Sequence, residues 1–504
     1  MARKLIALRQ HRHWRHWLGA PILLCMLMLG ASIAPSAFAA GGATSAQVTV
    51  NLHQTLSTVS PLAIGVNDAV WDGHLQDDGV SSLLRADGVK VMRYPGGSTA
   101  DNFHWQTNTL DDGSNAGNDT FDQFMQVAQK VEATPIITVN YGSGTPAEAA
   151  AWVQYANITK HYHIHYWEIG NELYGNGTYG ATWETDKHAL GPASYANNSL
   201  QFIQAMKAVD PSIQIGLVLT APGNWPDGQT SATSPQPWDD TVLPIACSAA
   251  NFVSVHWYPQ GPTGETDAGL LAASANGEGT PVSFTPSIPS MVSSLRSEIN
   301  QYCGSHASAV QIMTTETNSV SYNPGKQTTN LVNALYLAEN YLTWLENGVT
   351  SVDWWDVHNS EVTGTNDSAS LYGANNYGDY GLLSVGNTDE PAANTPFPDY
   401  YGLQIVSKVV GGFDRIVAAS SNQGLVQVFA VKKADGSVAV LLINTDPNTT
   451  YSVSIAGLDT NGGATVYSYG QNSASVSVTH TSGHNASTQT IAPYSLTAVV
   501  FHQN

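Results

Sequence analysis

The chain has 504 residues, and 18 Lys and Arg against 39 Asp and Glu give it a formal net charge of −21 at pH 7. So acidic a chain has little electrostatic attraction for nucleic acid or anionic lipid, which excludes proteins that bind these polyanions through basic patches. Only 11% of its residues are charged, against about 25% in average proteins, and such a surface suits an extracellular protein with a neutral substrate.

Residues 1–39 have the pattern of a secretory signal peptide. Basic residues precede the apolar run Leu18–Ala34, and the small residues Ala37 and Ala39 flank a cleavage point. A membrane anchor is the alternative, but the run is short for a bilayer span and contains a proline. We therefore expect a secreted, extracellular protein that is soluble and free of the membrane after signal cleavage.

Two cysteines, Cys247 and Cys303, remain once the expected signal peptide is removed. Disulfides persist in oxidising compartments, so these two could pair outside the cell. The sequence does not say whether their Cα atoms lie close enough, and the pairing stays open. The two cysteines form no C-x-x-C motif, so they do not indicate a zinc site.

From residue 62 to 410, short β-like runs alternate with helical stretches. The expected strands are Leu62–Asn67, Val89–Arg93, Pro135–Asn140, Tyr166–Glu172, Ile213–Leu219, Phe252–Tyr258, Gln311–Glu316 and Val352–Val357. Eight strand-then-helix units predict an α/β fold in which a parallel sheet closes into a (β/α)8 TIM barrel. An open doubly wound sheet is the alternative, but it rarely needs eight units, and no G-x-G-x-x-G motif follows the first strand.

The helical stretches carry apolar residues at helical spacing. In Thr328–Leu345 the leucines at 331, 335, 342 and 345 form one stripe. Further helices are expected at Ala147–Lys160, Gln201–Val209 and Tyr400–Val410.

After Gly411 the pattern changes to strands with tight turns. The expected strands are Gly424–Val431, Ser437–Asn444, Tyr451–Ile455, Ala464–Ser468, Ala474–Val478 and Leu496–Phe501. No convincing helix interrupts them, which predicts an antiparallel β-sandwich over residues 411–504. In the N-terminal segment 40–61, the alternation of Gln47–Leu52 would allow it to add a strand to that sandwich.

Function in a barrel of this kind is carried at the carboxyl ends of its strands. Glu172 closes the fourth expected strand and Glu316 the seventh. Those strands are not neighbours, so the two side chains can converge across the barrel mouth. Glycosidic bond cleavage needs such a pair, because one carboxyl protonates the leaving oxygen while the other attacks the anomeric carbon or activates water. Each glutamate alone would be an ordinary solvated side chain; together they predict a glycoside hydrolase.

Other polar and aromatic residues fall at or just beyond the same strand ends. They are Asn67, Asp68, Arg93, Ser98, Asn140, Asn171, His256, Tyr258 and Trp355. With the two glutamates they predict a sugar-binding pocket, in which indole faces stack on sugar rings. Glu168 lies four residues before Glu172, deeper in the strand, and is expected to support the site. For the tryptophans of the barrel, ordinary packing is the alternative.

Metal ions and other cofactors are not predicted. His256, Asp356 and His358 come from different strands without an H-x-x-x-H or H-E-x-x-H spacing, so we expect them to line a polar pocket rather than to ligate a metal. Neither a phosphate-binding P-loop nor a serine-hydrolase G-x-S-x-G elbow occurs where such a motif would have to lie.

Three segments resemble the clan-A glycoside hydrolases. They are Arg93–Trp105 (RYPGGSTADNFHW), Tyr166–Glu172 (YWEIGNE) and Thr315–Asn318 (TETN). The greatest likeness is to the α-L-arabinofuranosidases of glycoside hydrolase family 51 and their relatives, over the expected barrel and the following sandwich. It implies release of arabinose from plant cell-wall polysaccharides or oligosaccharides by a retaining, double-displacement mechanism, with the two carboxyls about 5–5.5 Å apart.

The resemblance also implies roles for individual residues. Glu172 would be the acid/base and Glu316 the nucleophile. Asn171 would hydrogen-bond the sugar 2-hydroxyl. Arg93 would keep the nucleophile ionised, and Tyr258 would orient it.

The chain departs from the family pattern at two places. Asn67 and Asp68 stand where the family has a sugar-binding glutamate after strand 1, and Ser98 replaces the asparagine that follows R-Y-P-G-G. These departures concern the preferred sugar more than the mechanism. They leave open a β-xylosidase, a β-glucuronidase or an endo-acting glucanase or xylanase, and more remotely a carbohydrate-binding protein without turnover. The oligomeric state is not predicted.

Overall fold

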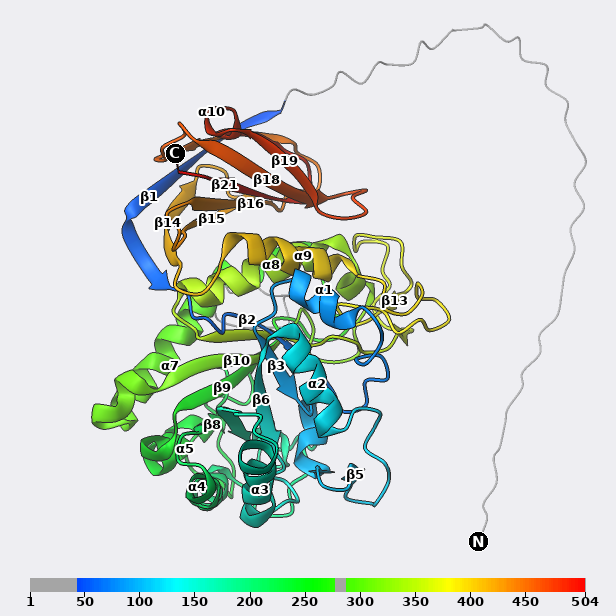
Figure 1. Ribbon diagram of the computed structural model, residues 1–504, viewed down its shortest axis with the longest axis vertical. Helices are drawn as coiled ribbons and strands as arrows, with labels where there is room; N and C mark the ends of the chain where they lie inside the picture. The colour runs from blue at the N-terminus through cyan, green and yellow to red at the C-terminus, as the bar shows by residue number, and fades with distance from the viewer. Residues whose placement is uncertain (1–42, 277–286, 504) are drawn as a thin grey trace, which may run out of the picture. The chain divides into compact units, whose positions relative to one another are not determined.

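The computed structural model describes residues 43–276 and 287–503 (Figure 1). The expected signal peptide, residues 1–39, lies outside the described residues. Within the described ranges, no helix is both long enough and apolar enough to cross a membrane.

Eight parallel strands close into a barrel, in the spatial order β10-β11-β2-β3-β6-β7-β8-β9. They are β2 (Ile64–Asn67), β3 (Val91–Tyr94), β6 (Thr134–Val139), β7 (Tyr166–Ile169), β8 (Gln214–Val218), β9 (Phe252–Trp257), β10 (Gln311–Thr317) and β11 (Ser351–Trp354). Each overlaps one of the eight expected ranges, so the barrel prediction is confirmed. The interior is packed with side chains, among them a cluster of Val91, Ile136, Phe252 and Met313, as in other barrels of this size.

Helices follow the barrel strands and surround them (Figure 1). They are α1 (Val80–Ala86), α2 (Phe121–Val131), α3 (Pro146–Val153), α4 (Pro192–Val209), α5 (Trp238–Ala246), α6 (Asp267–Asn276), α7 (Ile288–Tyr302), α8 (Leu331–Glu346) and α9 (Pro398–Val409). α3 continues as a π-helical turn, Gln154–Thr159. The loops carry the short strand pairs β4 (Phe103–His104) with β5 (Thr109–Leu110) and β12 (Val362–Thr363) with β13 (Tyr377–Gly378).

Two helices differ from their expected form. α4 begins nine residues before the expected Gln201, at Pro192 in its first turn, a position where proline is favoured because its missing N–H would be unpaired anyway. α8 is buried from Leu331 to Leu345 on every face rather than along one stripe. It is enclosed because it contacts α6, α7, α9 and the strand β1 (Thr44–Thr58) as well as the barrel.

The C-terminal region forms one nine-stranded sheet in the order β19-β18-β21-β16-β15-β14-β1-β17-β20. Its C-terminal members are β14 (Arg415–Ser421), β15 (Val426–Lys432), β16 (Val438–Asn444), β17 (Tyr451–Ala456), β18 (Gly463–Gly470), β19 (Ser477–Ser482), β20 (Thr488–Ile491) and β21 (Ser495–Phe501), with the single helical turn α10 (Gly483–Ala486) before β20. The sheet curls on itself, so that Val453 of β17 and Val466 of β18 share one apolar cluster. This is the sandwich arrangement that the sequence predicts.

The strand β1 joins the N-terminal end of the described chain to this sheet. It pairs antiparallel with β14 and parallel with β17, so the sheet is not wholly antiparallel. Ala46, Val48 and Val50 point into the sheet's core, while the residues between them are exposed. The alternation of Gln47–Leu52 belongs to this longer strand.

The sheet and the barrel share one continuous apolar core. Leu403 of α9 belongs to the same cluster of buried residues as Phe429, Leu441 and Leu496 of the sheet. α9 contacts β16, β18 and β21 directly.

Cys247 and Cys303 form a disulfide, a pairing that the sequence leaves open. Cys247 directly follows α5 and Cys303 directly follows α7. Both helices end shortly before the amino ends of β9 and β10, so the bond lies at the end of the barrel opposite to the carboxyl ends of the strands.

Candidate active site

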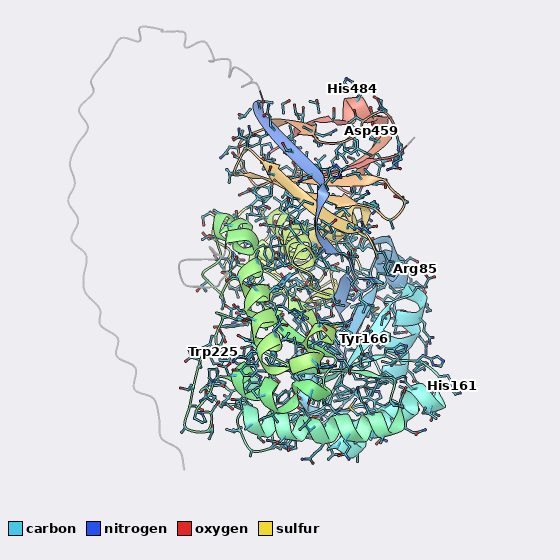
Figure 2. All side chains as sticks on the ribbon, turned by 90° about the vertical axis from the view of Figure 1, so that its left-hand side faces the viewer. Arg85, His161, Tyr166, Trp225, Asp459 and His484 are labelled. Carbon is cyan, nitrogen blue, oxygen red and sulfur yellow. A yellow bond between two sulfur atoms is a disulfide. The ribbon has the colours of Figure 1, made fainter. Side chains whose placement is uncertain are left out.

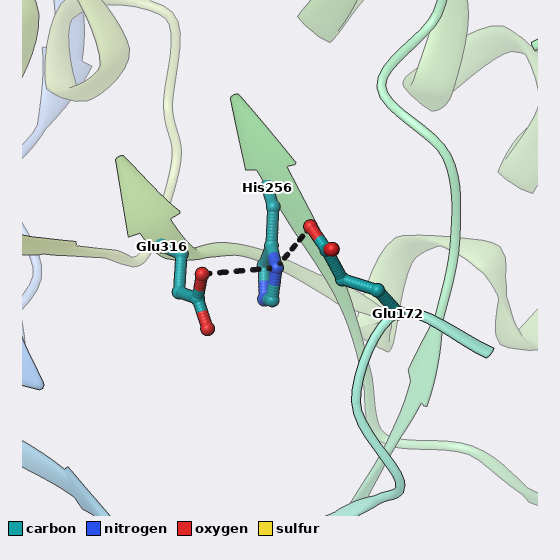
Figure 3. Close-up of side chains that lie close together, drawn as sticks. All are labelled: Glu172, His256 and Glu316. Atoms are coloured by element: carbon teal, nitrogen blue, oxygen red, sulfur yellow. Dashed lines mark hydrogen bonds and ion pairs between the residues drawn. The ribbon is translucent and has the colours of Figure 1, made fainter. Parts of the chain in front are cut away.

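Glu172 and Glu316 converge on one imidazole at the barrel mouth (Figure 3). Glu172 lies just beyond β7, and Glu316 lies near the end of β10. His256 of β9 stands between them, with its Nδ1 2.9 Å from Glu172 Oε1 and 3.5 Å from Glu316 Oε2. An oxygen of each carboxylate lies within 4.8 Å of the other and of the imidazole. Two strands that are far apart in sequence thus bring their glutamates together.

Glu316 is held by two donors on its two oxygens. Arg93 donates from Nη1 to Oε1 at 2.8 Å, and the Tyr258 hydroxyl donates to Oε2 at 2.9 Å. The Glu316 side chain is only 7% exposed. The two donors hold the carboxylate in one orientation, as a group that attacks a bound substrate requires.

The Arg93 guanidinium is buried and has further partners behind the site. Its Nε donates to Glu168 at 2.8 Å, its Nη2 to Asn171 Oδ1 at 2.8 Å and its Nη1 also to Asn67 Oδ1 at 3.0 Å. Burial alone would lower the pKa of Arg93, but the carboxylates of Glu168 and Glu316 raise it. Arg93 therefore stays charged and holds Glu316 in a fixed orientation.

Glu172 has a different set of donors. Its Oε1 accepts from the Tyr174 hydroxyl at 3.0 Å, and its Oε2 accepts from the indole of Trp183 at 2.9 Å. Burial would raise the pKa of Glu172, but the hydrogen bond and charge of His256 outweigh burial and lower it. In the free protein this carboxyl is accordingly ionised and paired with His256.

The two ring nitrogens of His256 contact different side chains. Nδ1 lies beside Glu172 Oε1, and Nε2 lies beside the Thr315 hydroxyl. Thr315 gives its hydroxyl proton to Glu168 at 3.2 Å, so its oxygen accepts from His256 Nε2 at 3.1 Å. Burial would lower the pKa of His256, but Glu316 and Glu172 raise it. One proton is therefore held between His256 Nδ1 and Glu172 Oε1, as imidazolium with carboxylate or as imidazole with carboxylic acid.

A cavity of about 830 Å³ opens above these groups. Of the residues that the sequence predicts for the site, those in its lining are Glu172, Glu316, Asn171, Ser98, His256, Tyr258 and Trp355. Gly97 also lines it, with φ +49°, and a Cβ there would lie 2.8 Å from the Trp355 ring. The close approach of backbone to indole thus requires glycine at this position.

Asn67, Asp68 and Asn140 are not among the residues that line this cavity. Asn67 is buried, accepts from Arg93, and donates from Nδ2 to the Thr315 carbonyl at 2.9 Å. Asn140 accepts from the backbone amides of residues 143 and 144. Asp68 points into a separate buried cluster of carboxylates. Arg93 likewise lies beneath the lining and contacts two residues that line the cavity, Glu316 and Asn171.

Several residues of the site escaped prediction. Glu184, in the loop after β7, accepts from Ser98 at 2.7 Å and from Asn171 Nδ2 at 2.8 Å, and burial together with the charge of Asp101 raises its pKa well above the usual range. Tyr174, Tyr322 and Tyr380 also line the cavity. They lie in long connections without periodicity, so no sequence signal marks them.

Two exposed tryptophans stand at the rim of the cavity. Trp183 is 43% exposed and Trp225, labelled in Figure 2, is 46% exposed. Their ring centroids lie 5.2 Å apart, and both line the cavity. Trp257 and Trp354, by contrast, are completely buried, so for them ordinary packing is the correct alternative.

The carboxylates of the site are already engaged by protein donors. Glu172, His256 and Glu316 lie close enough together to hold a metal ion, but the guanidinium of Arg93 occupies one face of Glu316 and supplies the positive charge there. His256 and His358 do not share a site, because His358 contacts Asp72 and Asn394 instead. The donor set fits proton transfer and nucleophilic attack better than metal binding.

Comparison with known proteins relates the chain to arabinofuranosidases. No family model matches it. A probable α-L-arabinofuranosidase C of Aspergillus fumigatus is 27% identical over an alignment of 223 residues, and the match covers 36% of this chain and 40% of that protein. The chain thus spans about 40% of the length of this curated relative.

The fold has close structural neighbours. A thermostable GH51 α-L-arabinofuranosidase from Thermotoga petrophila superposes with a TM-score of 0.67 at 16% identity, over 91% of this chain and 100% of that one. A bifunctional glucanase-xylanase from a metagenome library superposes with a TM-score of 0.65 at 14% identity, over 92% of this chain and 100% of that one. At these identities the likeness shows the fold, a TIM barrel followed by a β-sandwich, and the chain resembles the clan-A glycoside hydrolases of family 51.

Proposed function

We propose that the chain is a secreted retaining glycoside hydrolase, an α-L-arabinofuranosidase that releases arabinose from plant cell-wall polysaccharides or oligosaccharides. The observation that carries this proposal is the approach of a Glu172 oxygen to within 4.8 Å of a Glu316 oxygen. Retaining glycosidases hold their carboxyls about 5–5.5 Å apart, whereas inverting ones leave about 6.5–9.5 Å for a water molecule. The separation supports direct attack by one carboxylate.

The two carboxyls would divide the reaction as follows. Glu316 attacks the anomeric carbon, the bond from that carbon to the leaving oxygen breaks, and Glu172 gives its proton to the leaving oxygen. Glu172, now ionised, takes a proton from water. The water oxygen attacks the anomeric carbon and releases Glu316. Arg93 and Tyr258 hold the Glu316 carboxylate in place for the first step.

The proton for the first step is held between His256 and Glu172. In the free protein the lowered pKa of Glu172 and the raised pKa of His256 place it on the imidazole. A sugar that fills the cavity displaces water, and desolvation favours the neutral imidazole–carboxylic acid form over the ion pair. Binding of the substrate therefore shifts the proton across the 2.9 Å contact between His256 Nδ1 and Glu172 Oε1, onto the carboxyl that must donate it.

Two observations bear on the identity of the sugar: the names of the relatives and the residues that line the cavity. The relatives with measurable sequence likeness are named arabinofuranosidases. An anionic sugar would need a free cation, and none of the described residues that line the cavity is Arg or Lys. This disfavours a β-glucuronidase among the alternatives.

An endo-acting enzyme is the second candidate. Trp225 and Tyr322 are exposed at the cavity rim, by 46% and 61%, and such rings stack on sugars beyond the cleaved bond. The fold is shared with a glucanase-xylanase. Both observations fit a longer glycan bound across the mouth.

Export from the cell is part of the proposal. Residues 1–39 have the signal-peptide pattern, and the Cys247–Cys303 disulfide is of a kind that persists in oxidising compartments.

The first experiment is hydrolysis of chromogenic α-L-arabinofuranoside, β-xyloside, β-glucoside and β-glucuronide by the purified chain. We expect cleavage of the arabinofuranoside. NMR of the product that forms first should show that the anomeric configuration is retained. Glu172→Gln should lose about 10²–10⁴-fold in kcat, because general acid catalysis is removed. Glu316→Gln should lose detectable turnover, because it removes the nucleophile.

Glu132→Gln is the control, since Glu132 is exposed on the barrel surface and should leave the rate unchanged. Product of inverted configuration would contradict the double displacement. Rates that survive either active-site substitution would refute the role given to that residue. Turnover restricted to another sugar, or to polymers, would keep the mechanism and replace the arabinofuranoside.

A further inference from the structure

Three aspartates converge in a buried cluster outside the cavity. Asp68 and Asp72 belong to the loop after β2, and Asp119 lies just before α2. One carboxylate oxygen of each lies within 4.8 Å of those of the other two. All three residues are at most 2% exposed. Groups so fully removed from water need partners for their charges.

Asp68 lacks such a partner. In residues 43–276 and 287–503, no hydrogen-bond donor reaches either of its oxygens, and one oxygen of Asp119 is likewise unpartnered. The carboxyl of Asp72 lies within hydrogen-bonding reach of the Asp68 carboxyl. Two carboxylates in contact require a shared proton or a shared cation between them.

Asp356, from the loop after β11, is a second and independent sign of a missing partner. It is fully buried, and within the described part of the chain neither of its oxygens has a donor. It lies close enough to interact electrostatically with both Asp68 and Asp72. A fourth carboxylate is therefore added to the cluster without any compensating donor.

Few positive groups face this cluster. The His358 imidazole lies 2.7 Å from Asp72 Oδ2, and its other nitrogen contacts Asn394. Asp379 and Glu316, which also interact with Asp356, are carboxylates and add negative charge. Several carboxylates sharing one imidazole leave negative charge uncompensated in a medium of low dielectric constant.

We propose that the cluster of Asp68, Asp72 and Asp119 is a structural calcium site. Carboxylate oxygens are the ligands that hard divalent cations prefer, and Ca²⁺ accepts six to eight oxygens in flexible geometry where Mg²⁺ demands a regular octahedron. His358 would act behind Asp72, orienting that carboxylate through the Nδ1 contact.

The site would fasten two loops of the barrel mouth to one another. The backbone of this region is already joined, because Asp119 N donates to the Val70 carbonyl at 3.0 Å and Tyr94 donates to the Asp119 carbonyl at 2.8 Å. Asp68 directly follows Asn67, which holds Arg93. A cation here stabilises the frame of the catalytic residues whatever sugar the cavity takes.

Protonation is the alternative means of neutralising the cluster. Burial and the charges of Asp72 and Asp119 raise the pKa of Asp68 well above its usual range, so a cation-free cluster would hold protons instead. The two states differ in metal content and in their response to added calcium, which makes them distinguishable.

The test uses the purified chain, stripped with a chelator and dialysed into metal-free buffer. Isothermal titration with CaCl₂ should give about one equivalent bound per chain, and the melting temperature should rise by several degrees at saturation. MgCl₂ at the same concentration should give a smaller rise. Absence of calcium binding, with an unchanged melting temperature, would overturn the proposal in favour of protonated carboxyls.

Two variants test whether calcium binds at this cluster. Asp68→Asn and Asp119→Asn should each weaken calcium affinity at least about tenfold by removing a charged ligand, while the exposed Asp78→Asn should leave it unchanged. Calcium binding that persists undiminished in both cluster variants would locate the ion elsewhere and refute the assignment. If a cluster variant fails to fold, the titration of the unmodified chain still shows whether the protein binds calcium.

Discussion

The guanidinium of Arg93 donates to four side chains, two of which are carboxylates. Its planar fork matches several acceptors at once, which lysine would not do. The sequence predicts only its contact with Glu316. The partners Glu168 and Asn67 follow from the closed barrel, in which β2, β3 and β7 present side chains to a common interior.

The convergence of Glu172 and Glu316 was predictable because the carboxyl ends of barrel strands meet at one mouth. Asn67, Asp68 and Asn140 also lie at or beyond strand ends, but they are not among the residues that line the cavity. Sequence alone locates the end of a strand only to within a few residues, and a shift of one residue changes the direction of the side chain. Glu184 depends on the path of a long loop, which no periodic pattern describes.

The pH dependence of stability should report the charge on His256. The raised pKa of His256 contributes stability that is fully present below its unfolded value of about 6.5 and is lost as pH rises through the folded pKa. The lowered pKa of Glu172 contributes stability above about pH 4.3 that is lost as pH falls through the folded pKa. Urea unfolding should therefore show the largest advantage of the native chain over His256→Gln between these two values.

Above neutral pH that advantage should decline as the imidazole loses its proton. His161→Gln is a suitable control, because His161 is exposed (Figure 2) and its substitution should change stability equally at all pH values. A difference between the native chain and His256→Gln that is constant from pH 5.5 to pH 9 would contradict a protonated His256.

At the scale of elements, the barrel strands are predictable because they are buried on both faces and read as continuous apolar runs. The strands of the C-terminal sheet are harder to predict from the sequence. β14 (RIVAASS) and β20 (TQTI) are rich in small or polar residues and acquire strand form from their neighbours. β19 lies at the sheet edge, and most of its residues are exposed. The expected strand Ala474–Val478 was based on apolar alternation and therefore begins too early in the chain.

The disulfide should contribute stability without affecting catalysis. Cys247 and Cys303 are 56 residues apart, and closing a loop of this length in the unfolded chain is worth about 4 kcal/mol in the chain-entropy model. The bond lies at the amino ends of β9 and β10, the face of a barrel associated with stability rather than function. We expect Cys247→Ser/Cys303→Ser to unfold at lower denaturant concentration with unchanged kcat/KM at 25 °C.

Reduction of the native disulfide should reproduce the loss of stability, and reductant should have no effect on the double variant. A double variant as stable as the native chain would mean that the bond adds no constraint. A fall in kcat/KM in proportion to stability would mean that the two ends of the barrel are coupled.

At the scale of the whole molecule, the barrel and the sheet share one apolar core and should unfold together. Tryptophan fluorescence tests this well, because every tryptophan of the described residues lies between Trp71 and Trp355, outside the sheet. Val48→Asp places a carboxylate in the core of the sheet, where Val48 is fully buried. We expect it to lower the melting temperature measured by barrel tryptophans, because an unpaired buried charge destabilises the common core.

Thr49→Asp is the matched control, since the neighbouring side chain on the same strand is exposed. It should leave the transition nearly unchanged. A Val48→Asp transition that is lowered by far-ultraviolet circular dichroism but not by fluorescence would show that the sheet unfolds separately from the barrel.

The position of β1 in the sheet has a consequence for how the chain is made. Its partner β14 emerges from the ribosome about 360 residues later, which at ordinary rates of translation takes roughly 20 to 70 s. Throughout that interval the apolar face of Ala46, Val48 and Val50 has no place to pack. We therefore expect the N-terminal part of the nascent chain to need protection from aggregation until the sheet can form.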